Sequence, residues 1–178
     1  QAAMQQLLTG QTRLPGFEGE WKVKRLGDLA QLSKSGVNPS ATPEAIFTHF
    51  SLPAFDDGEM PVLETGASIG SNKFVVLQNA VLLSKLNPRI PRGWAPIGIP
   101  DNSVCSTEFL VLLPKPAVDR NFLLCVCRSP NVSAQMELHA IGTTGSHQRI
   151  QPNHPLAIAV TVPPDIDEQT HIAAVLSD

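Results

Sequence analysis

The chain has no long hydrophobic run and few cysteines, and each shortage excludes a class of protein. Its longest apolar runs, Phe109–Leu113 and Leu156–Val160, are far too short to cross a bilayer, and no basic and apolar leader opens the sequence. We therefore expect a cytoplasmic protein with no membrane partner. The three cysteines cannot all pair, and Cys125 and Cys127 lie too close together for an unstrained disulfide. We expect reduced, mostly buried thiols and no zinc site.

The sequence also lacks the motifs of catalysis and of cofactor binding. The segment Gly142–Ser146 has no P-loop lysine, and there is no Gly-x-Ser-x-Gly elbow, glycine-rich cofactor loop or Asn-Pro-Pro-aromatic methyltransferase motif. Ser146 beside His147 raises the hypothesis of a hydrolase, but adjacency says little about a triad that assembles in space. Asp56 and Asp57 could share a proton or a metal, although with the following glycine they favour a turn. We expect a non-catalytic protein without cofactor or metal.

Length and composition predict one folded domain with many connections. A chain of 178 residues that is 42% hydrophobic can bury one substantial core. Its 16 prolines and 12 glycines indicate stiff connections rather than disorder. Strands are predicted at Trp21–Leu26, Lys73–Leu77, Ala80–Leu86, Glu108–Leu113 and Leu156–Val162. Helices are predicted at Val118–Cys127 and, beyond a break at Pro130, at Ser133–Ala140. Because strands and helices do not alternate regularly, we predict an α+β fold, loop-rich, with an irregular mixed or antiparallel sheet and short helices.

Both ends of the sequence have a helical pattern. An apolar stripe predicts a helix over Gln1–Leu8, ended by Gly10. Near the other end, Asp165 followed three residues later by Glu168 resembles a capping box at the start of a helix. We expect both helices to be truncated parts of longer ones, so that the chain begins inside a helix of its parent protein.

The distribution of charge matters more than its total. The formal net charge of −3 argues against a nucleic-acid partner, because modules that bind DNA are usually basic. Between Lys73 and Arg149, however, eight basic residues face four acidic ones, which gives this stretch a charge of +4. Such polarity allows one face to meet a polyanion while the whole stays negative.

Two polar segments, Ser84–Ile90 and Gly142–Arg149, combine long hydrogen-bonding side chains with residues that break regular structure. We expect them to be loops that present a surface to DNA. The candidate DNA-binding residues there and at a nearby strand start are Lys85, Asn87, Arg89, Arg92, Ser106, Thr107, Ser146, His147, Gln148 and Arg149.

The residue types suggest distinct roles and leave alternatives open. Gln148 is the best candidate for reading adenine, because Gly142 and Gly145 allow the backbone to approach a duplex closely. The basic residues suit phosphates or guanine, or else form a solvated turn. Asn87 either contacts a base or shapes its turn. Ser106 and Thr107 either contact a phosphate or cap the strand that follows them.

Several segments together resemble the target-recognition domain of the specificity (S) subunit of type I restriction-modification enzymes, and the resemblance covers nearly the whole chain. The segments that carry it are Gln5–Gly10, Arg13–Phe17, Trp21 with Leu26–Asp28, Phe50–Asp56, Ser84–Arg89, Ser106–Phe109, Gly145–Arg149, and Val162–Pro164 with Glu168, Gln169, Ile172 and Ala173. The order and spacing of these segments are more specific than any one of them.

The resemblance implies a non-catalytic reader of DNA. In that family two target-recognition domains, separated by paired antiparallel helices, each read one half of a bipartite site in double-stranded DNA. Methyltransferase (modification) subunits and a restriction subunit that translocates DNA bind around them. Residues 1–16 would then be the end of a spacer helix and a linker, residues 17–164 the recognition domain, and residues 165–178 the start of the distal helix. The preceding helix suggests the second of the two domains. The alternative is a protein-interaction module that docks the methyltransferase subunit.

Overall fold

Frequent prolines and glycines divide the chain into short elements, which a computed structural model describes for residues 2–142 and 148–177. The strands are β1 (Lys22–Arg25), β2 (Ala30–Ser33), β3 (Gly36–Val37), β4 (Ile46–Phe50), β5 (Val62–Thr65), β6 (Lys73–Val75), β7 (Val81–Ser84), β8 (Gly93–Trp94), β9 (Ser103–Cys105), β10 (Phe109–Pro114) and β11 (Ala159–Val162). The helices are α1 (Ala2–Leu8), α2 (Leu26–Leu29), α3 (Leu52–Asp56), α4 (Arg120–Cys127), α5 (Pro130–Leu138), α6 (Asn153–Ala157) and α7 (Ile166–Ser177), with 3-10 turns at Pro39–Ala41 and Gly66–Ser68.

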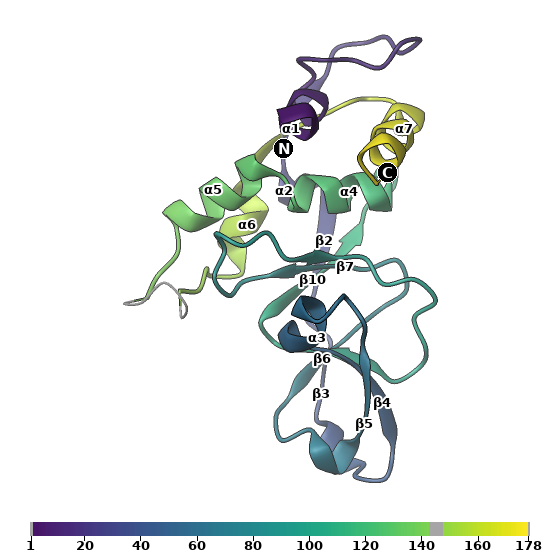
Figure 1. The fold of residues 1–178 in the computed structure, drawn as a ribbon, viewed down its shortest axis with the longest axis vertical. Coiled ribbons are helices and arrows are strands. Elements are labelled where there is room, and N and C mark those ends of the chain that lie inside the picture. The colour runs from purple at the N-terminus through teal and green to yellow at the C-terminus, as the bar shows by residue number, and fades with distance from the viewer. Residues whose placement is uncertain (1, 143–147, 178) are drawn as a thin grey trace.

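The strands form three sheets rather than the single irregular sheet expected, and the α+β class is confirmed. A two-stranded ribbon pairs β1 with β11, the middle sheet has the order β2-β10-β7-β8, and the lower sheet has the order β3-β6-β9-β4-β5. The pairings are antiparallel except that of β4 with β9. Figure 1 shows α1, α2, α4 and α7 at one end of the long axis, the middle sheet below them, and the lower sheet at the other end, with α3 between the two sheets.

The middle sheet is buried on both faces, which explains its continuous apolar runs. On β7, Val81 and Leu83 belong to the core beneath the helices, whereas Leu82 belongs to a second core with Phe50 and Trp94. This alternation follows from the two-residue period of a strand. Each fully buried side chain of this size stabilises the fold by about 1.5–3 kcal/mol.

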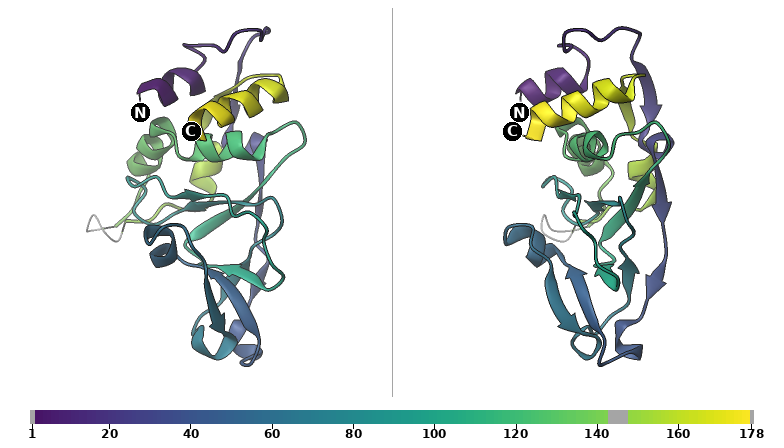
Figure 2. Two further views of the ribbon diagram at one scale, coloured as in Figure 1. Left: turned by 45° about the vertical axis from the view of Figure 1, so that its right-hand side comes forward. Right: turned by 90° about the vertical axis from the view of Figure 1, so that its right-hand side faces the viewer.

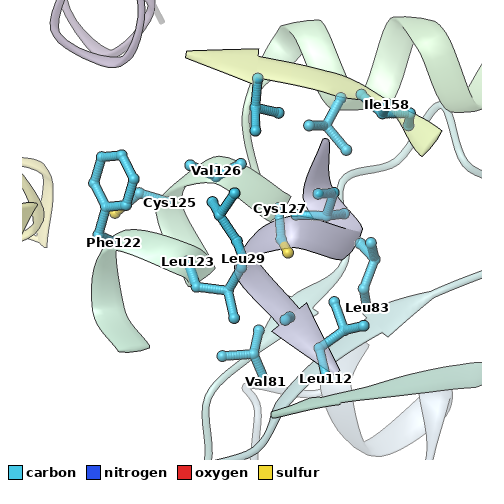
Figure 3. Packing of buried hydrophobic residues seen from close by; sticks show 14 of the residues in the cluster. Leu29, Val81, Leu83, Leu112, Phe122, Leu123, Cys125, Val126, Cys127 and Ile158 are labelled. Carbon is cyan, nitrogen blue, oxygen red and sulfur yellow. The ribbon is translucent and has the colours of Figure 1, made fainter. Parts of the chain in front are cut away.

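The helical end packs around α4. Figure 3 shows Leu123 of α4 directed toward Val81 of the middle sheet, with Leu29 between Leu123 and Val126. The three cysteines are buried and unpaired, as expected. Among the described residues, no helix has the length and apolarity needed to cross a membrane.

Two predicted boundaries are wrong by three residues, and the others lie within two residues of the structure. Helix α5 begins at Pro130 itself, since Ser129 Oγ accepts a hydrogen bond from Val132 N–H (3.3 Å) and proline is favoured in the first helical turn. The last strand begins at Ala159 rather than at residue 156, because a proline-containing turn of helix, α6, occupies the segment before it.

The two ends of the chain meet through a buried carboxylate. Helices α1 and α7 lie side by side (Figure 2). Asp165 caps α7, but Glu168 does not complete the expected capping box. Its side chain is 0% exposed and accepts two hydrogen bonds from Arg13, both 2.8 Å, and one from Trp21 Nε1 at 3.3 Å. This pairing raises the pKa of Arg13. Glu168 therefore joins the linker after α1 to the start of α7.

Candidate nucleic-acid interface

The first polar segment predicted from the sequence lies beside the described end of the second, at Gln148 and Arg149, although Asn87 and Gln148 are 61 positions apart. Asn87 N–H donates to the carbonyl oxygen of Gln148 (2.8 Å), and Ile150 N–H donates to that of Lys85 (3.1 Å). Between these bonds, Leu86 and Arg149 form an antiparallel bridge. Residues 84–90 and 148–150 thus make one extended structure, called here the polar ledge. Ser146 and His147 lie outside the described residues.

Asn87 is a buried residue of the ledge whose backbone forms a turn. Its φ of 51° lies in the left-handed region that asparagine adopts more readily than most residues, and its carbonyl accepts from Ile90 N–H (3.0 Å). The side chain is only 8% exposed, and Oδ1 is buried without a hydrogen-bond partner among the described residues. Asn87 therefore shapes the turn, which is one of the two roles left open by the sequence, and its contact with a base stays a prediction.

The predicted cations differ in their surroundings. Arg92 donates to both carboxylate oxygens of Asp56, at 2.7 and 2.9 Å, so its charge is compensated. Lys85 is half-buried on the ledge. Arg89 is exposed and lines a separate hollow toward α5, with Arg128 and Glu137. The structure therefore does not bring the three cations into one cluster.

The predicted hydroxyl residues stand at the turn into β10. Ser106 Oγ accepts from Glu108 N–H at 3.2 Å, which is the capping role left open by the sequence. Ser106 also lines a hollow and so remains accessible from it. Thr107 is exposed.

Beside the ledge, between the lower sheet, α3 and the segment that follows β7, lies an open hollow of about 510 Å³. Its polar lining comes from His49, Ser51, Asp56, Lys73, Arg92 and Ser106, and Leu86 of the ledge completes one wall. Ledge and hollow therefore form a continuous surface. Its volume is that of a typical pocket for a small molecule or a nucleotide-sized group.

Sequence reasoning missed three residues of this surface. Glu108 Oε1 accepts from Arg149 Nε (2.9 Å), and His49 Nδ1 pairs with Glu64. Lys73 lines the hollow and is almost buried. Burial of the nearby Cys105 thiol raises its pKa to about 12, and the positive charge of Lys73 partly opposes this rise. Only Lys73 carried a signal in the sequence, as the first cation of the locally basic stretch.

The chain was compared with known proteins. No protein-family model matches it, and none of the curated proteins matches it significantly. Solved structures do match. A chain from a study of the complex assembly and conformational transition of the type I R-M system is similar over 93% of this chain, with a TM-score of 0.75 and 21% identity.

Two further structures agree. The HsdS subunit of Thermoanaerobacter tengcongensis gives a TM-score of 0.72, with 21% identity over 94% of this chain. The S subunit of the type I restriction-modification system of M. genitalium gives 0.64, with 18% identity over 95%. This chain spans 43%, 43% and 41% of the three neighbours, less than half of each. The fold is the one found in type I S subunits, which confirms the fold implied by the sequence resemblance.

Proposed function

We propose that this chain, which has the fold found in type I S subunits, reads one half of a bipartite DNA sequence and performs no chemistry itself. The observation that carries the proposal is the polar ledge, where two segments remote in the sequence meet beside an open, polar hollow. Such a surface offers hydrogen-bonding side chains for base edges and cations for phosphates.

Within this surface, Gln148 is the proposed reader of adenine. Its backbone is tied to Asn87, so its side chain starts from a defined position, and a glutamine amide matches the donor and acceptor of adenine in the major groove. Lys85, Arg89 and Arg149 would position the duplex through phosphates or guanine. Ser106, Thr107, Ser146 and His147 are proposed to complete the contact, as the sequence suggested. Asn87 shapes the turn through its backbone and Arg92 is paired with Asp56, and the DNA contacts of both stay predictions.

The proposed division of the chain follows its architecture. Residues 17–164 would be the recognition domain, and residues 1–16 and 165–178 would belong to the helices that separate two such domains. Because the chain spans less than half of its structural neighbours, the complete protein would hold a second recognition domain. The proposed partners are double-stranded DNA, methyltransferase subunits and the restriction subunit.

A domain exchange tests the proposal. In this experiment, a recognition domain in a type I S subunit of known specificity is replaced by residues 17–164 of this chain. The methylated sites of the host genome are then sequenced. One half of the bipartite motif should change while the other half stays. An active complex whose motif is unchanged would show that the chain does not read DNA. Within the exchanged domain, Gln148→Ala should alter the preferred base at one position. Gln31→Ala, at an exposed glutamine of β2, is the matched control.

A further inference from the structure

Lys73 is a buried cation without an anionic partner. The residue is 8% exposed, and within residues 2–142 and 148–177 its ammonium donates only to Ser71, to the side-chain oxygen at 2.6 Å and to the carbonyl at 3.3 Å. Among the described residues, no carboxylate lies within 4.0 Å of Nζ. An ammonium group has three N–H donors, so one remains for another acceptor. Since burying an unpaired charge destabilises a protein, its retention calls for a reason outside the fold.

The lower sheet places this cation at the mouth of the hollow. The register pairs Phe74 with Cys105 and Cys105 with Phe50. Extending both registers by one residue places Lys73 opposite Ser106 and Ser106 opposite Ser51. Ser106 N–H donates to the carbonyl oxygen of Phe50, the residue before Ser51, at 3.1 Å. Residues opposite one another on adjacent strands face the same side of a sheet, so all three side chains point into the hollow that they line.

The other charges of the hollow are compensated, which leaves Lys73 as its unbalanced charge. Arg92 is neutralised by Asp56 through two hydrogen bonds. His49 pairs with Glu64 through Nδ1, and its other ring nitrogen, Nε2, is buried without a hydrogen-bond partner among the described residues. An uncompensated ammonium and the serine hydroxyls of this hollow are groups that bind a phosphate oxyanion, and the unsatisfied Nε2 of His49 lies buried in its wall.

We propose that the hollow binds one phosphate of the DNA backbone and that Lys73 neutralises its charge. This inference rests on the proposed function, because the polar ledge that borders the hollow would hold the same duplex. Lys73 then anchors the backbone and the ledge reads the bases, so the two regions have different roles in affinity and in specificity.

The test compares duplex binding by the assembled complex that carries this chain with binding by its Lys73→Met variant, over a range of salt concentrations. Methionine keeps the length of the side chain and removes its charge. We expect roughly tenfold weaker binding at low salt for target and unrelated duplexes alike, and a salt dependence whose slope falls by about 1. The preferred sequence should not change. Lys24→Met removes an exposed charge on β1 and serves as the matched control, with no change expected.

Other outcomes would overturn the inference. Wild-type affinity and slope in Lys73→Met, together with intact sequence preference, would remove the phosphate site and leave the proposed function standing. A loss confined to some sequences would make Lys73 a base reader. Absence of duplex binding by the wild-type complex would overturn both proposals. Inorganic phosphate that shifts the NMR signals of His49, when a duplex does not, would assign the hollow to free phosphate.

A folding defect would not obscure the result. Because the substitution removes a buried unpaired charge, we expect Lys73→Met to melt at the wild-type temperature or above it. If circular dichroism instead shows loss of structure, Lys73→Arg and Lys73→Gln replace it. The arginine variant keeps the charge and should keep the wild-type salt dependence. The glutamine variant removes the charge and should show the reduced slope expected for Lys73→Met. Equal slopes in these two variants would contradict the proposal.

Discussion

Arg149 donates through Nε to Glu108 Oε1 at 2.9 Å, an ion pair between residues 41 positions apart. A bond through Nε fixes the direction of the guanidinium group and leaves its two terminal amino groups for other acceptors. The Arg149 side chain is 55% exposed, so these groups face solvent. Glu108 therefore orients an exposed cation of the polar ledge and also reduces its attraction for any phosphate.

We expect Glu108→Gln to weaken discrimination between sequences and to strengthen binding to unrelated DNA. The neutral amide of glutamine holds the guanidinium group of Arg149 less strongly than the carboxylate does, and the substitution removes one negative charge from the surface. The ratio of affinities for target and unrelated duplexes should fall by about tenfold, which lies within the discrimination that one base contact usually provides. Fluorescence anisotropy with both duplexes measures it.

The control for Glu108→Gln is Glu44→Gln, which removes an exposed acidic residue from the lower sheet's far end. It should leave the ratio unchanged. If Glu108→Gln weakens binding to both duplexes equally, the carboxylate does not orient a reading residue.

The buried contact of Glu168 with Arg13 predicts a loss of stability. Glu168→Gln leaves the guanidinium group of Arg13 without its carboxylate and detaches the linker from α7. We expect the melting temperature to fall by roughly 5–10 °C. Asp167→Asn, an exposed change in the same helical turn, should have little effect. Equal melting of the two variants would mean that the contact adds nothing to stability.

The sequence predicted best those elements whose residues are buried together. The runs Val81–Leu83 and Phe109–Leu112 are continuously apolar because both faces of the middle sheet are covered, and a short apolar run bounded by turns is a strong signal for a strand. The lower sheet was largely missed. Val62 and Leu63 of β5 are exposed at 49% and 70%, so this strand has no alternation between a buried and an exposed face.

The candidate site could be predicted only as far as local signals reach. Polar side chains beside prolines and glycines identified the segments of the ledge, since loops and exposed groups follow from local chemistry. The roles of Glu108 and Lys73 depend on which strands lie next to each other, and this pairing is set by tertiary packing. A single sequence does not contain that information in readable form, so the hollow could not be foreseen.

Gly66 predicts a sharp difference between two glycine substitutions. A Cβ atom at Gly66 would lie 2.3 Å from the carbonyl oxygens of both Pro39 and Thr42, where the two 3-10 turns meet. Backbone atoms cannot move away at low cost, so Gly66→Ala should destabilise the protein by about 3 kcal/mol. Gly70→Ala, with no atom within 4 Å of the added carbon, should be close to neutral. Urea unfolding of both variants measures the difference, and similar values would contradict the close packing of these turns.

The buried thiols predict how stability changes at alkaline pH. Burial raises the pKa of Cys105 and of Cys127 to about 12, because the thiolate would lose its hydration. In the unfolded chain these thiols titrate near their ordinary value of about 8.5. Above that pH the unfolded state releases protons that the folded state keeps, so the free energy of unfolding falls as pH rises. The slope approaches about 1.4 kcal/mol per pH unit for each thiol and ends near the folded pKa.

Urea unfolding between pH 8 and pH 10 tests the thiol prediction. The chain contains no tyrosine, so phenol ionisation does not contribute in this range. The slope of Cys127→Ala should be shallower than that of the wild type by up to about 1.4 kcal/mol per pH unit. Since the thiolate is the reactive form, Ellman's reagent at pH 8 should label neither Cys105 nor Cys127 until urea unfolds the protein. Equal slopes in the wild type and the variant, or rapid labelling of the folded protein, would show that these thiols are accessible to water.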